Sequence, residues 1–324
     1  MDPLGEALHF LRMSGTSYCT SELTAPWGLQ LPEVKGGLTF HVLTSGRCWL
    51  EVPGSRRRQL EPGDLVLVPH GEGHRLVSKP GTRAPRIDDL PHGRVSDRYK
   101  ILRHGGGGES AHLVCGSVRF DHPAAHRLIR ALPKVIHVKA AGRGEMDWLD
   151  GTLRLMAAEA RELRPGGETV ITRLADILVI QAIRSWIATD EAARTGWLGA
   201  LQDPQIGRAI ALVHHHPERD WTLSSLAGSV AMSRSAFAAR FTELVGEPAM
   251  HYVARWRMHV ALDWLKEDGA AVGELAGRLG YRSEAAFSRA FKRFIGASPG
   301  AVRRDWRHPH FLSALETATS EARR

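Results

Sequence analysis

The chain has 324 residues, of which 43% are hydrophobic and 24% charged, and this composition excludes intrinsically disordered and fibrous proteins. Lys and Arg number 43 against 35 Asp and Glu, which gives a formal charge of +8 and favours a polyanionic partner. The length allows two ordinary domains, each with its own hydrophobic core.

The composition of the N-terminus and the number of cysteines predict where in the cell the protein is found. Asp2 and Glu6 stand where a signal peptide carries basic residues, and no apolar run approaches the ~20 residues of a membrane helix. Cys19, Cys48 and Cys115 are too few for the disulfide framework of a small secreted protein. We therefore expect a soluble, cytoplasmic protein that does not bind membranes.

The first part of the chain has the pattern of a β domain. From Gly28 to Phe120, short apolar runs alternate with Gly and Pro, which predicts an antiparallel sandwich or barrel. A polar stretch from Lys79 to Ser110 interrupts this pattern and contains several prolines and four consecutive glycines. Loops of this length are typically functional or disordered, and we expect most of this one to be disordered.

After Pro133 the apolar period changes to about 3.6 residues. Glu145 to Arg164 and Thr169 to Thr189 are predicted to be amphipathic helices, separated by a Pro-Gly-Gly stop at 165–167. The second helix has a wider apolar stripe than a lone surface helix exposes. Packing against the β domain and dimerisation both explain this stripe, and the sequence leaves the choice open.

The last third of the chain contains an internal repeat. Each copy predicts a short helix, a tight turn, a Ser N-cap and a second helix, which is the helix–turn–helix arrangement that binds the major groove. Leu226-Ala227-Gly228 recurs 49 residues later as Leu275-Ala276-Gly277, and Ser233, Phe237, Phe241 and Gly246 recur 50 residues later as Ser283, Phe287, Phe291 and Gly296.

Each second helix has an apolar stripe, and the opposite face is predicted to meet DNA. The stripes are Phe237, Phe241 and Leu244 in the first copy, and Phe287, Phe291 and Phe294 in the second. The face opposite is small and nearly uncharged in the first copy but cationic in the second, where it suits guanine and phosphate. The predicted DNA-contacting residues are Arg234, Ser235, Ala238, Ala239, Arg240 and Thr242 in the first copy, and Arg282, Ser288, Arg289, Lys292 and Arg293 in the second.

The linker between the copies is predicted to be one helix from Pro248 to Lys266. At ~1.5 Å per residue it spans roughly 28 Å, close to the ~34 Å turn of B-DNA. The two units can therefore enter successive major-groove segments on one face of a duplex.

At these residues the chain resembles the AraC/XylS family of transcriptional regulators, over about residues 205–307. The resemblance rests on WTLSSLA, MSRSAFAARFTELVGEPAMHYVARWRM and ELAGRLGYRSEAAFSRAFKRFIGASPGAVRR. It implies two helix–turn–helix units that bind double-stranded promoter DNA, usually as a homodimer, and an activator that contacts RNA polymerase. The pair Ala238-Ala239 departs from the larger polar residues of many relatives, so we expect weak base discrimination by the first unit.

The β region carries a second pattern, formed by Gly63, Pro69, His70, Gly71 and His74. Its spacing is similar to the second motif of cupins, which are small β barrels that often hold a metal with three His and one Glu. The first cupin motif is expected around residues 32–39, where no histidine occurs. The ordinary cupin metal site is therefore incomplete.

The chain also resembles a branch of AraC-like regulators with a diverged cupin sensor. The recurring residues of that branch correspond here to His41, His74 and Cys115, a set that suits Zn²⁺ or another divalent metal. The alternative is that both histidines are buried barrel residues and Cys115 is a small hydrophobe. Some relatives respond to oxidants, and Cys19, in a segment expected to be flexible, is the redox candidate.

Together these observations predict an α+β chain. It comprises a cupin-like β-barrel sensor (1–135), a helical connection and dimerisation segment (136–200), an all-α domain with two helix–turn–helix units (201–310) and a tail (311–324). The predicted function is a sequence-specific transcriptional regulator, an activator and not an enzyme, that senses a small molecule, metal or oxidant. The alternative is a metal-dependent cupin enzyme with an accessory DNA-binding module, which the incomplete metal motif disfavours.

Overall fold

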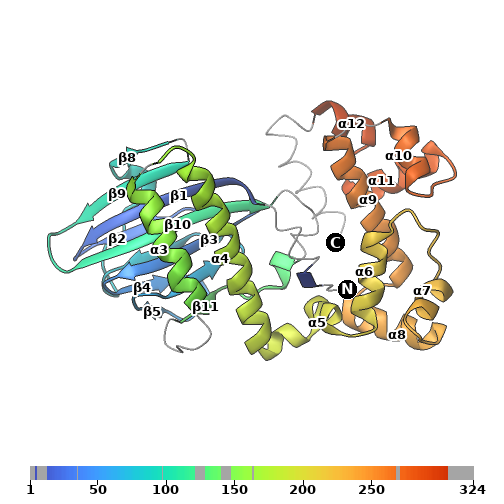
Figure 1. The fold of residues 1–324 in the computed structure, drawn as a ribbon, viewed down its shortest axis with the longest axis horizontal. Coiled ribbons are helices and arrows are strands. Elements are labelled where there is room, and N and C mark those ends of the chain that lie inside the picture. Colours follow the sequence, from blue (N-terminus) through green and yellow to red (C-terminus); the bar gives the residue numbers. More distant parts are fainter. Residues whose placement is uncertain are drawn as a thin grey trace. The chain divides into compact units, whose positions relative to one another are not determined.

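The computed structural model describes residues 4–5, 13–34, 36–96, 98–120, 128–139, 147–162, 164–267 and 271–305. The chain divides into two compact units, with the boundary between Ala193 and Arg194. The N-terminal unit is rich in strands and the C-terminal unit is helical (Figure 1), so the predicted α+β class is confirmed. Within the described ranges, no helix is long and apolar enough to cross a membrane.

The N-terminal unit contains two β-sheets. The larger has the strand order β11-β6-β3-β10-β1-β9-β8, and the smaller the order β2-β7-β4-β5. All pairings are antiparallel except that of β1 with β9. The strands are β1 (Met13–Thr24), β2 (Gly28–Leu31), β3 (Gly37–Ser45), β4 (Cys48–Glu51), β5 (Arg58–Leu60), β6 (Leu65–Val68), β7 (His74–Val77), β8 (His92–Arg94), β9 (Tyr99–Gly105), β10 (Ser110–Phe120) and β11 (Ile136–Val138).

The two sheets enclose an apolar core. Leu43, Val66 and Leu113 of the larger sheet belong to one buried cluster with Leu50 and Leu76 of the smaller sheet. Because successive side chains of a strand point to opposite faces, the larger sheet also has an outer apolar face.

Two helices, α3 (Asp147–Glu162) and α4 (Gly167–Thr189), lie over this outer face (Figure 1). Helix α4 contacts β6 and β11, and Phe40 and Leu67 of the sheet are fully buried. Gly116 leaves room for Phe40, since a Cβ there would lie 2.3 Å from the phenyl ring. The apolar stripe of α4 thus packs against the β domain, although Val170 and Ile177 remain exposed.

The prediction that most of 79–110 is disordered is wrong. This stretch contains a short 3-10 helix (Ile87–Asp89) and the strands β8 and β9. Strand β9 pairs in parallel with β1, and the Tyr99 hydroxyl lies 3.0 Å from that of Thr20. Gly105, at φ +141°, allows the strands to approach, because a Cβ there would lie 1.9 Å from the Thr24 carbonyl oxygen. A strand whose partner lies about 80 residues away leaves no local signal.

The C-terminal unit confirms the predicted repeat. Hydroxyl groups of Ser233 and Ser283 accept hydrogen bonds from the N–H groups of Ala236 and Ala286, at 3.3 and 3.2 Å. Its helices are α5 (Gly196–Gln202), α6 (Ile206–His215), α7 (Leu223–Ser229), α8 (Arg234–Val245), α9 (Ala249–Glu267), α10 (Val272–Arg278), α11 (Glu284–Ile295) and α12 (Pro299–Asp305); a 3-10 turn, Glu191–Arg194, precedes α5.

The predicted apolar stripes are correct except at their last positions. Phe237 and Phe241 of α8 are buried, as are Phe287 and Phe291 of α11. The third buried positions, however, are Val245 and Ile295, and the predicted Leu244 and Phe294 are only half-buried. Helices α8 and α11 end at Val245 and Ile295, and the C-cap glycines that follow, Gly246 and Gly296, adopt left-handed φ values of +80° and +88°.

Candidate nucleic-acid interface and sensor site

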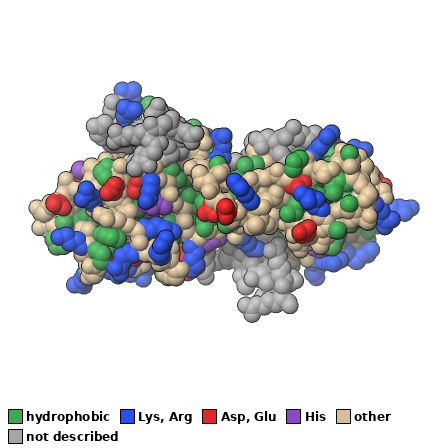
Figure 2. Space-filling view, turned by 90° about the horizontal axis from the view of Figure 1, so that it is seen from below, with side chains coloured by type: hydrophobic (Ala, Val, Ile, Leu, Met, Phe, Trp, Pro, Cys, Tyr) green, Lys and Arg blue, Asp and Glu red, His purple; other side chains and the backbone are tan. Residues whose placement is uncertain are grey.

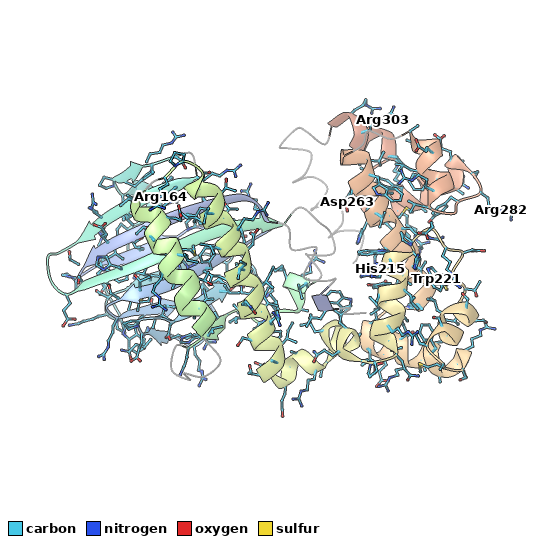
Figure 3. All side chains as sticks on the ribbon, in the orientation of Figure 1. Arg164, His215, Trp221, Asp263, Arg282 and Arg303 are labelled. Carbon is cyan, nitrogen blue, oxygen red and sulfur yellow. The ribbon has the colours of Figure 1, made fainter. Side chains whose placement is uncertain are left out.

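Helix α11 presents a cationic face opposite its buried phenylalanines. Arg289, Lys292 and Arg293 are exposed and Ser288 is half-buried. Arg282 points outward from the turn before α11 (Figure 3). Within the described part of the chain, no acidic side chain pairs with Arg289 or Lys292. This face can offer bidentate donors to a base and positive charge to phosphates.

Helix α8 presents a smaller and more neutral face. Arg234, Ser235, Ala239 and Thr242 are exposed, and Ala238 is half-buried. Short side chains of this kind allow the helix backbone to approach a groove closely but carry few donors for base edges.

Arg240, also predicted to contact DNA, is held by another part of the same unit. Its Nε and Nη2 donate to the Asp203 carboxylate at 3.0 and 2.5 Å, and that carboxylate is almost fully buried. Burial alone raises the pKa of Asp203, but hydrogen bonds from the Ile206 N–H and from Arg240 bring it below its ordinary value. The guanidinium therefore ties α8 to the turn before α6.

Sequence reasoning did not single out Arg257, on the linker helix α9. Its Nε and Nη2 donate to the carbonyl groups of Pro217 and Arg219, both at 2.7 Å. Gly280, in the turn of the second repeat, lies against the same group, since a Cβ there would be 3.6 Å from Nη2 and 3.3 Å from the Glu218 carbonyl oxygen. Arg257 thus ties the loop before the first helix–turn–helix to α9 and lies near the turn of the second, and no sequence spacing signals it.

In the N-terminal unit, His41 of β3 and His74 of β7 form a buried pair. Their Nε2 atoms are 2.7 Å apart, and the side chains are fully enclosed. The His74 Nδ1–H donates to the Glu72 carbonyl at 2.8 Å. Burial, and for His41 also the neighbouring imidazole, lowers the pKa of both residues, so both are neutral.

These contacts fix the tautomers of the pair. A neutral His74 that donates through Nδ1 must accept through Nε2, so His41 donates through its own Nε2. The His41 Nδ1 is then a bare acceptor, and it is buried without a hydrogen-bond partner among the described residues. An unsatisfied buried polar atom costs about 1–3 kcal/mol.

The three cysteines lie together, close to this pair. Cys115 is the cross-strand partner of both His41 and Cys19, and it shares one buried core with Cys48. Burial raises the pKa of all three thiols, for Cys48 to about 12. All three are therefore protonated at neutral pH.

As placed, His41, His74 and Cys115 do not fit a metal ion. Tetrahedral zinc with bonds of ~2.0–2.1 Å separates two nitrogen ligands by about 3.3 Å, more than the 2.7 Å found between the two Nε2 atoms. The described residues contain no group of three metal-ligating side chains in a suitable arrangement. The Nε2 of His70, the other histidine of the cupin-like motif, lies 3.0 Å from the Leu132 carbonyl oxygen.

The expectation that Cys19 lies in a flexible segment is wrong. Cys19 is in β1, between β10 and β9, and is only partly exposed. Its thiol lies 3.7 Å from the Ser21 hydroxyl. Partial burial also raises the pKa of the Cys19 thiol, which disfavours the thiolate that reacts with oxidants.

Comparisons with known proteins agree with both halves of this architecture. Residues 2–188 match the cupin family, and residues 226–305 match a helix-turn-helix domain. A putative AraC-like transcription regulator of Streptomyces lividans is 33% identical, over 95% of this chain and 99% of its own length. The chain belongs to the AraC-like transcriptional regulators.

Two further comparisons concern a full-length regulator and an isolated domain. The regulator named RclR of Escherichia coli K12, an RCS-specific HTH-type transcriptional activator, is 28% identical over 94% of this chain and 97% of its own length. The crystal structure of the AdpA DNA-binding domain with a target DNA matches 32% of this chain and 94% of that domain, at 32% identity and a TM-score of 0.31.

Arg289 tests the assignment of the second reading helix. Replacing it by Ala is expected to weaken binding to the best duplex selected from a random library by about 1–3 kcal/mol, because a bidentate contact to guanine is lost. Arg289→Lys keeps the charge but loses the planar guanidinium that can donate two parallel hydrogen bonds to one base. This variant is therefore expected to retain affinity for random DNA while losing the base preference. Equal losses on selected and random duplexes in a titration would contradict the base-reading role.

The His41–His74 pair predicts how the stability of the cupin unit depends on pH. Both folded pKa values lie below the ordinary ~6.5, so below that pH the unfolded chain binds more protons than the folded one. The free energy of unfolding therefore keeps its full value above pH ~6.5. It decreases as the pH falls, by about 1–3 kcal/mol for the pair at pH 5.5. Urea unfolding at pH 7.5 and 5.5 measures this. The loss should vanish in the double variant His41→Leu/His74→Leu and persist in His92→Gln, an exposed control.

Proposed function

We propose that this AraC-like regulator is a cytoplasmic activator that binds promoter DNA as a homodimer, contacts RNA polymerase, and is controlled by a signal received in its cupin domain. The signal is a small molecule, a metal or an oxidant. The observation that carries the sensing role is the bare His41 Nδ1, fully buried beside His74 in the cupin unit. An unsatisfied acceptor that destabilises the core supports a role beyond packing.

The names of the relatives support this function over an enzymatic one. The full-length relatives are named as transcription regulators, and that of Escherichia coli as an activator. No observation on the described residues favours the metal-dependent cupin enzyme.

Metal binding at His41, His74 and Cys115 stays a prediction. Binding would require the two imidazoles to separate and the Cys115 thiol, whose pKa burial raises, to lose its proton. The positive charge of zinc or another divalent metal would then stabilise the thiolate.

Dimerisation is proposed through the outer surface of the α3–α4 hairpin. Leu155, Val170 and Ile177 keep 57%, 42% and 45% of their area exposed, and the last two lie seven residues apart on one face of α4. Exposed apolar groups of this kind mark association surfaces.

Ile177→Glu tests this surface. A charge in an apolar interface is expected to shift the chain from dimer to monomer in sedimentation velocity at micromolar concentration. Val95→Glu, at an exposed apolar residue outside the hairpin, should leave the dimer intact. A wild-type chain that is monomeric, or a variant that stays dimeric, would refute the proposed interface.

Oxidant sensing is tested by footprinting cysteine variants, with and without peroxide, on the DNA upstream of the protein's own gene. If Cys19 senses the oxidant, peroxide changes promoter occupancy in the wild type and in Cys48→Ser, whose thiol has a pKa of about 12. The change should disappear in Cys19→Ser and Cys115→Ser. Identical oxidant responses in all four proteins would end the redox role.

A further inference from the structure

A cavity of about 380 Å³ opens on the outer side of the smaller sheet of the cupin unit. The strand register places Gln30, Arg75 and Glu51 in one row across β2, β7 and β4. Because side chains alternate along a strand, Arg75 points away from the barrel interior, into which the preceding His74 points. The turn between β4 and β5 lines the cavity with Val52 and Pro53.

The cavity wall carries more positive than negative charge. Glu51 contacts the Arg57 Nε at 2.9 Å and the Arg75 Nη1 at 3.2 Å, so one carboxylate is shared by two guanidinium groups. The side chain of Glu51 is 17% exposed, whereas those of Arg75 and Arg57 are 36% and 53% exposed. The outward parts of both guanidinium groups therefore remain accessible from the cavity.

Arg75 is held in place before any ligand arrives. Its Nη1 donates to Glu51 at 3.2 Å and its Nη2 to the Thr82 carbonyl at 2.7 Å. A donor fixed at both ends loses little side-chain entropy on binding. The position is thus preorganised.

The positive charge of the adjoining turn is not balanced locally. Arg58 has a buried Nε without a hydrogen-bond partner among the described residues. Burial, and then the nearby Arg56, lower the pKa of this guanidinium. Basic side chains are also frequent on the visible surface of the N-terminal part of the molecule (Figure 2).

We propose that this cavity binds a small organic carboxylate, held by Arg57 and Arg75, with its apolar part against Pro53. Arginine presents five donors in a fork that matches a carboxylate, so each guanidinium can hold both Glu51 and a ligand. The volume lies at the lower end of the ~300–1,000 Å³ range of ligand pockets, which limits the ligand to a small acid.

The inference rests on the proposed function in one respect, because the carboxylate is then the effector of the sensor. The Gln30 side chain, which lines the cavity, donates to the His74 carbonyl at 3.2 Å. A ligand that displaces Gln30 therefore acts directly on β7, the strand that carries His74 of the buried pair.

Isothermal titration of the full chain with pentanoate tests the binding site, with the uncharged pentanamide as the matched ligand. Saturable heat is expected with pentanoate and none with pentanamide. Arg57→Gln, at a half-exposed side chain, should weaken pentanoate binding roughly tenfold or more, because a charge-assisted contact is lost. Arg56→Gln, on the same turn but outside the cavity lining, is the control and should bind as the wild type does.

The proposal is overturned if pentanoate gives no saturable heat, if pentanamide binds equally well, or if Arg57→Gln and Arg56→Gln bind alike. Inorganic phosphate binding as tightly as pentanoate would show a general anion site and would also overturn it. The site lies within the cupin unit, so Arg289→Ala should leave the pentanoate heat unchanged even when DNA binding is lost. Failure of DNA binding and failure of this proposal are thereby separated.

Discussion

The DNA-binding half of the molecule depends on the buried face of helix α9, which runs from Ala249 to Leu265. Tyr252, near its beginning, packs on Phe241 of α8 with ring centroids 5.7 Å apart. Met258 and Leu265, farther along, belong to the core that contains Phe287 and Phe291. Removing one such phenylalanine would cost about 3–5 kcal/mol. The same helix thus completes two cores, and the reading helices are positioned by it (Figure 1).

Local signals made the C-terminal half predictable. The Ser N-caps, the C-terminal glycines and the phenylalanine stripes act within one helical turn, so the repeat, the linker helix and the exposed cations of α11 follow from the sequence. Arg240 shows where this reasoning ends. Arg240 lies on the predicted exposed face of its helix. Its partner Asp203, however, lies 37 residues earlier in the chain, and no periodicity links the two.

The N-terminal half depends on pairings between distant segments. The gathering of Cys19, Cys115 and His41 in one row follows from the register of β1, β10 and β3, which spans nearly 100 residues of sequence. The sequence singled out His41 and His74 as one candidate set, yet their direct contact and the bare Nδ1 depend on how the two sheets face each other. The same holds for β9, whose ordering depends on the distant strand β1.

Arg257 has a consequence for how promoters can vary. Because it bonds to the backbone of the loop before the first unit and lies near Gly280 in the turn of the second, Arg257 opposes rotation of one reading helix relative to the other. One inserted base pair turns the second half-site by about 34–36° relative to the first. Operators of this regulator should therefore keep a constant helical phase between half-sites, even where their base sequence at the first unit drifts.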